Sequence, residues 1–148
     1  MWSQNNRTTT IYLIRHAEKA DASRDTELSA AGKQRAQKLA KYFIDNNLSI
    51  GAIYSTPFIR TQQTVAPLAN LLSLDVIPYK PEEMTIKSLL AEHAGMTALV
   101  VGHSNTIPQY INDFFAGKKL EDIPENEFDN LYIITVKNGE PALQQIKL

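Results

Sequence analysis

The run TALVV at residues 97–101 is apolar nearly throughout, which is typical of a strand that is buried on both faces. Strands of this kind occur in parallel sheets that helices cover on both sides. A parallel sheet also needs a crossover segment between successive strands. The rest of the sequence supplies these segments, because short β-branched runs alternate with longer amphipathic runs.

This alternation predicts an α/β fold, with one three-layer domain over residues 1–148 and a mainly parallel sheet flanked by helices. The strand candidates are 9–15, 51–56, 74–79, 97–103, 130–137 and 141–148. The turn signal KNGEP joins the last two, whose sequence permits an antiparallel pair at the sheet edge. The helix candidates are 30–47 with Ser29 as its N-cap, 57–72, 82–93 and 104–115. We expect residues 1–8 to form a flexible N-terminal segment.

Charge and cysteine content exclude several classes of protein. Fifteen basic and sixteen acidic residues leave a formal net charge of −1, so no nucleic-acid or membrane surface is predicted. The lack of cysteine excludes disulfides, cysteine-ligated zinc and thiol nucleophiles. No apolar run approaches the roughly 20 residues that span a bilayer, and MWSQNNRTTT lacks the apolar core of a signal peptide. We expect a cytoplasmic protein, or one exported through a leader that this sequence does not include.

Ionisable side chains follow three of the predicted strands. Arg15 and His16 end the first strand, Arg60 follows the second at the start of a helix, and His103 follows TALVVG. The carboxyl ends of parallel strands meet at one edge of the sheet, where ligands bind, so we expect these four residues to meet there. Taken alone, each is better explained by a structural role, but their shared placement favours a site. The third histidine, His93, we interpret as a surface residue near a helix end.

Two arginines and two histidines around one point suit phosphoryl transfer. The guanidinium fork matches phosphate oxygens, and a neutral imidazole can attack phosphorus and carry the phosphoryl group. A second imidazole, if protonated, would stabilise the transition state. The helix near Ser104 would direct its free N–H groups at the same anion. Besides the four residues, Ser104 and Lys19 are predicted to bind phosphate or substrate.

Four segments resemble, in order, the successive motifs of the histidine phosphatase superfamily, branch 1, which is also called phosphoglycerate-mutase-like. They are LIRHAEK (13–19), DTELSAAGKQRAQKLA (25–40), IYSTPFIRTQQTVAPLA (53–69) and ALVVGHSNTIP (98–108). The resemblance extends over residues 9–109, about two thirds of the chain. It implies a phosphoglycerate-mutase-like sheet flanked by helices, and catalysis by two in-line displacements without a metal or other cofactor. His16 then matches the phosphorylated nucleophile, and Arg15, Arg60 and His103 match the rest of the phosphate pocket.

The sequence departs from the family at two places. Ala17 stands where the family commonly has glycine, so a positive φ at this position would be strained. The segment LDVIPYKPEEMTIKSLL (74–90) has almost no room for the insertion that carries the general-acid glutamate of mutases and sugar phosphatases. In this short segment the sequence resembles the SixA-type phosphohistidine phosphatases, which also lack the insertion. The short segment favours a phosphatase over a phosphoglycerate-mutase-type phosphotransferase.

The proton donor to the leaving group has several candidates. Glu18 is nearest to the nucleophile in sequence, whereas Glu82 and Glu83 follow the third strand, where the family places its acid. The acidic loop EDIPENEFDN adds Glu127 and Asp129. Each of these carboxylates is also readily explained as a solvated surface group. An alcohol leaving group needs the proton more than a phosphorylated imidazole does.

Other functions compete with a phosphatase that acts on a phosphorylated small molecule or a phosphohistidine protein. His16, His103 and Glu18 superficially form a two-histidine, one-carboxylate metal site, although two arginines nearby would repel the cation. Loss of activity in a chelator would support that alternative. A catalytically silent module that binds phosphorylated ligands is a second alternative, and a turnover assay separates it from an enzyme.

Overall fold

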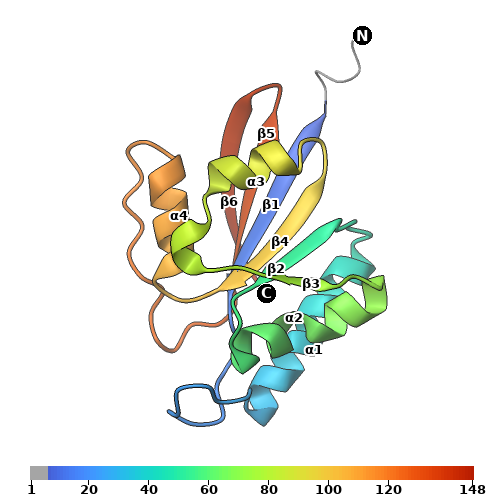
Figure 1. The fold of residues 1–148 in the computed structure, drawn as a ribbon, viewed down its shortest axis with the longest axis vertical. Coiled ribbons are helices and arrows are strands. Elements are labelled where there is room, and N and C mark those ends of the chain that lie inside the picture. The colour runs from blue at the N-terminus through green and yellow to red at the C-terminus, as the bar shows by residue number, and fades with distance from the viewer. Residues whose placement is uncertain (1–6) are drawn as a thin grey trace.

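The computed structural model describes residues 7–148, which form a six-stranded sheet with helices on both faces (Figure 1). The elements in chain order are β1 (Thr8–Arg15), α1 (Ala30–Asp45), β2 (Ala52–Ser55), α2 (Ile59–Leu72), β3 (Val76–Pro78), the 3₁₀ turn η2 (Pro81–Glu83), α3 (Ile86–Glu92), β4 (Thr97–Gly102), α4 (Thr106–Phe114), β5 (Asn130–Lys137) and β6 (Glu140–Lys147). The strand order is β3-β2-β4-β1-β5-β6. The first four strands of this order are parallel, and β5 and β6 are antiparallel. The predicted α/β fold with a mainly parallel sheet is confirmed.

The two central strands bury side chains on both faces of the sheet. In β1, Ile11 and Leu13 contribute to one apolar cluster, and Tyr12 and Ile14 contribute to the other. The first cluster packs under α3 and α4, and the second packs under α1 and α2, so the helices form the outer layers (Figure 1). This double burial explains why TALVV, which forms most of β4, is apolar. None of the helices described in residues 7–148 has the length and apolar character to cross a membrane.

Two predicted segments differ from the structure. The predicted helix 82–93 is divided into η2 and α3, because Met84 and Thr85 are extended. The Thr85 side chain accepts a hydrogen bond from the Ser88 backbone N–H at 3.1 Å, so this threonine caps the shorter helix. Of the predicted flexible segment, residues 1–6 lie outside the described chain. Thr8, the last residue of that segment, begins β1 and pairs with β5.

Candidate active site

The two histidines meet because their strands are neighbours in register. Arg15 at the end of β1 lies opposite Gly102 at the end of β4. The next residue of each strand is a histidine, and the backbone N–H of His16 donates to the Gly102 carbonyl at 2.9 Å. As a result, the ring centroids of His16 and His103 are 5.6 Å apart. The structure thus brings these two residues together at the carboxyl edge of the sheet.

The segment after His16 is held by α1 and α2. The Ala17 N–H donates to the Thr64 hydroxyl at 2.9 Å, and the Glu18 carbonyl accepts from the Ser29 N–H at 2.9 Å. A Cβ on Gly32 would collide with the Glu18 carbonyl oxygen, so α1 approaches this closely only because residue 32 is glycine. The φ of Ala17 is not positive, and this residue therefore carries none of the strain that the missing family glycine suggested.

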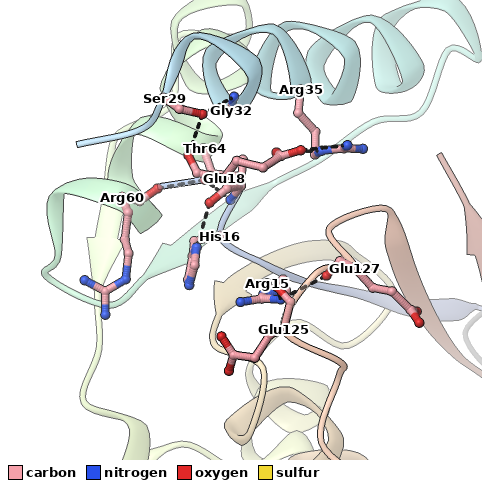
Figure 2. A network of polar contacts seen from close by, with 11 residues as sticks. Arg15, His16, Glu18, Ser29, Gly32, Arg35, Arg60, Thr64, Glu125 and Glu127 are labelled. Carbon is pink, nitrogen blue, oxygen red and sulfur yellow. Dashed lines mark hydrogen bonds and ion pairs between the residues drawn. The ribbon is translucent and has the colours of Figure 1, made fainter. Parts of the chain in front are cut away.

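His16 is a buried imidazole whose tautomer is fixed by one hydrogen bond. Its Nδ1 lies 2.7 Å from the Ala17 carbonyl oxygen, and only 4% of the residue is exposed (Figure 2). A carbonyl only accepts hydrogen bonds, so Nδ1 carries the ring proton and Nε2 keeps its lone pair. Burial, together with the charges of Arg15 and Arg60, lowers the pKa of His16 from 6.5 to about 4. At neutral pH the ring is therefore uncharged, and its Nε2 lone pair is free.

His103 is held by a threonine that sequence analysis did not identify. The Nε2 of His103 lies 2.9 Å from the hydroxyl oxygen of Thr56, which is fully buried and bonded to the Thr61 hydroxyl at 2.9 Å. Burial, followed by the charges of Arg60 and Arg15, lowers the pKa of His103 to about 4. The second imidazole is therefore neutral at pH 7, not the protonated group considered from sequence. Thr56 directly follows β2, so the same strand-end rule that selected the histidines points to it.

Arg15 is buried beneath the loop that precedes β5. Its Nη1 donates to the carbonyl oxygens of Pro124 at 3.2 Å, Glu125 at 3.2 Å and Glu127 at 3.0 Å. The guanidinium carbon lies 4.2 Å from the ring centroid of Phe128, an arrangement typical of a cation–π contact. Burial lowers the pKa of Arg15, but an arginine remains charged at neutral pH.

Arg60 makes similar contacts on the other side of His16 (Figure 2). Its Nη1 donates to the Arg24 carbonyl at 3.0 Å, and its guanidinium carbon lies 4.5 Å from the ring centroid of Phe58. The Phe58 ring lies in turn 5.5 Å from that of His103. Sequence analysis missed both phenylalanines, because an aromatic residue beside a strand end is usually part of a core.

The two arginines create an anion-binding environment. The Nε atoms of Arg15 and Arg60 are both buried and have no hydrogen-bond partner among residues 7–148. A buried donor without a partner costs about 1–3 kcal/mol, which an accepting ligand would recover. Within the described part of the chain, no carboxylate pairs with either guanidinium group within 4.0 Å. Two cations without an ion-pair partner in the described structure, beside neutral imidazoles, suit an oxyanion with several oxygens, such as a phosphoryl group.

The carboxylates chosen from sequence do not join this group. Glu18 accepts two hydrogen bonds from Arg35, from Nε and Nη2 at 2.8 Å each, and Figure 2 shows its side chain directed at α1. Those hydrogen bonds lower the pKa of Glu18, which makes it a poor proton donor. Glu82 and Glu83 are exposed on η2, and no contact with either imidazole is found for them in the described structure.

The other residues selected from sequence lie around the site or away from it. Lys19 is exposed and forms an isolated β-bridge with Leu28, whereas Ser104 is half-buried and its carbonyl accepts from the Ile123 N–H at 2.9 Å. His93 lies outside the site, and its interpretation as a surface residue is wrong. Its side chain is only 12% exposed, and its Nε2 lies 2.6 Å from the hydroxyl of Tyr54 in β2.

The low pKa of His16 predicts a pH dependence of stability. The unfolded chain protonates this imidazole near pH 6.5, whereas the folded chain protonates it only near pH 4. The unfolded state therefore binds more protons in this window, and the free energy of unfolding falls as the pH drops through it. At pH 5.5 we expect the free energy of unfolding to be about 1 kcal/mol lower than at neutral pH because of His16. Urea denaturation at several pH values would measure it, and His16→Asn should remove this part of the slope. An equal slope in both proteins would contradict the assigned neutral state.

Comparisons with known proteins agree with the resemblance in the sequence. Residues 11–81 match the model of the histidine phosphatase superfamily (branch 1). No curated protein matches the chain. Solved structures do match it, among them "the protein histidine phosphatase SixA complexed with tungstate", with a TM-score of 0.73 and 20% identity over 93% of this chain and 96% of that one.

Two further solved structures have the same fold. YhfR of Bacillus stearothermophilus gives a TM-score of 0.71 at 17% identity, over 91% of this chain and 95% of that one. Phosphoglycerate mutase of Plasmodium falciparum gives a TM-score of 0.64 at 17% identity, over 95% of this chain and 91% of that one. At these identities the likeness concerns the fold, which is phosphoglycerate-mutase-like over nearly the whole chain.

Proposed function

From the match of residues 11–81 to the histidine phosphatase superfamily (branch 1), we propose that this chain is a metal-independent phosphatase that acts through a phosphohistidine on His16. One observation carries the proposal. A neutral imidazole with a free Nε2 lies beside two arginines whose buried Nε atoms have no partner in the described structure. This arrangement combines a nucleophile with donors for the oxygens of its electrophile.

The proposed cycle consists of two displacements at phosphorus. In the first, Nε2 of His16 attacks the phosphorus atom and the bond to the leaving group breaks. Arg15 and Arg60 hold the equatorial oxygens, and their charges take the role that a metal ion has in other phosphatases. In the second, water attacks the phosphohistidine, the N–P bond breaks, and phosphate leaves. His103 lies close enough to His16 to contact the same phosphoryl group.

The short connection between β3 and α3 supports hydrolysis over a mutase reaction. Only the residues from Tyr79 to Thr85 join these elements. A mutase must enclose a phosphorylated intermediate while it reorients, and this connection provides no enclosing insertion. The similar structure described as a protein histidine phosphatase, SixA, suggests phosphohistidine on a protein as one substrate class beside phosphomonoesters.

The proposal is tested by phosphate release from 4-nitrophenyl phosphate and from a phosphohistidine-containing protein, each with and without a chelator. We expect turnover that the chelator leaves unchanged, and a phosphorylated protein intermediate that is labile in acid and stable in base. Loss of turnover in the chelator would favour the metal site. Binding of phosphorylated ligands without any turnover would favour the silent binding module.

A further inference from the structure

The proposed reaction needs a proton for its leaving group, and most carboxylates near the site already have partners. Glu18 pairs with Arg35. Glu127 accepts from Asn130 and Lys147 at 3.1 Å each, and Asp129 lies 3.5 Å from the same lysine. Each of these carboxylates thus already has a cationic partner. Glu125, in contrast, forms no ion pair within 4.0 Å with a described residue.

The backbone on both sides of Glu125 is fixed against the site. Before it, the Ile123 N–H donates to the Ser104 carbonyl at 2.9 Å, next to His103, and the Ile123 side chain is buried. At and after it, the carbonyls of Glu125 and Glu127 accept from Nη1 of Arg15. The Glu127 N–H also bonds to the Pro124 carbonyl at 2.9 Å, which places Glu125 at the tip of a turn.

In Figure 2 the Glu125 side chain extends below Arg15, and its carboxylate lies beyond the free end of the His16 ring, on the Arg15 side. The negative charge of this carboxylate is close enough to Arg15 to raise the pKa of that arginine, against the larger lowering by burial. A phosphoryl group attacked by Nε2 would have its leaving group opposite His16, which is the side where Glu125 lies. The residue is exposed, so a leaving group can reach it from solvent.

We infer that Glu125 is the general acid of the proposed phosphatase, and this inference rests on that proposed function. As the bond from His16 Nε2 to phosphorus forms and the bond to the leaving oxygen breaks, the Glu125 carboxyl proton moves to that oxygen. In the second displacement the Glu125 carboxylate takes a proton from the attacking water, the N–P bond breaks, and the carboxyl group is restored.

The test compares two substrates whose leaving groups differ in their need for a proton. Phenyl phosphate releases a basic phenoxide, whereas 4-nitrophenyl phosphate releases a stabilised one. For Glu125→Gln we expect kcat/KM to fall by roughly 10²–10⁴-fold with phenyl phosphate and by less than about threefold with 4-nitrophenyl phosphate. The ratio kcat/KM reports the first displacement, so a slow second step does not hide the effect.

Glu121→Gln is the matched control, because Glu121 is an exposed glutamate of the same loop. This variant should keep the native kcat/KM with both substrates. Equal losses on the two substrates, or no loss on phenyl phosphate, would overturn the role of Glu125 and leave the phosphatase in place. A native protein that hydrolyses neither ester would overturn the proposed phosphatase and this inference with it. Equal melting temperatures of the native and variant proteins would exclude a loss through misfolding.

Discussion

Replacement of His16 by alanine should lower kcat by about four orders of magnitude or more, because it removes the proposed nucleophile and with it the covalent route. The two arginines remain in this variant and still bind the phosphoryl group, so affinity for an inert oxyanion should persist. Phosphate release measures the first effect, and calorimetric titration with tungstate or inorganic phosphate measures the second. The variant should also lack the acid-labile phosphorylated intermediate.

His93→Ala is the control for this experiment. His93 is also a partly buried histidine, but it contacts Tyr54 on the face of the sheet beneath α3 and lies outside the site. We expect it to retain turnover. Comparable turnover by His16→Ala and the native protein would show that another group attacks phosphorus, and the proposed mechanism would then be abandoned.

Replacement of Arg60 by alanine should lower kcat by roughly two orders of magnitude or more, because its donors act on charge that develops in the transition state. Arg60→Lys should recover only part of this loss, since a lysine keeps the charge but lacks the planar fork and the buried Nε. Steady-state kinetics with one aryl phosphate would give kcat and KM for both variants.

A weakened KM with unchanged kcat in Arg60→Ala would refute the proposed role, because the residue would then bind substrate and transition state equally. Lys41→Ala serves as the control for the removal of a cation. Lys41 is an exposed residue of α1 that pairs with Asp45, and its replacement should leave kcat unchanged.

The fold was largely predictable because its strands and helices have different hydrophobic periods. The side chains of Ile11 and Leu13 pack into one apolar cluster, and those of Tyr12 and Ile14 pack into the other. A continuous apolar run therefore predicted a strand that is covered on both faces. The strand order was not predicted, since pairing depends on contacts between distant segments. The division of the third helix was also missed, although Thr85 is a residue that typically caps helices.

The candidate site was predictable only in part. Arg15, His16 and His103 come directly at strand ends, and that position is visible in the sequence. Glu125 and Phe128 come from a long loop, and their place beside Arg15 results from main-chain hydrogen bonds that leave no pattern in the residue types. The ion pair of Glu18 with Arg35, 17 residues later, was equally hidden.

Both site arginines hold their neighbouring loops through carbonyl oxygens of the main chain, from Arg24 on one side and from residues 124–127 on the other. Every amino acid has such an oxygen, so substitutions at exposed loop positions such as Arg24 and Asn126 leave these hydrogen bonds in place. The exposed surface of these loops can therefore diverge in evolution while the proposed phosphate-binding core stays constant. Because these hydrogen bonds do not depend on residue type, the exposed positions of the two loops are suitable for a mutant library that seeks new substrate preferences.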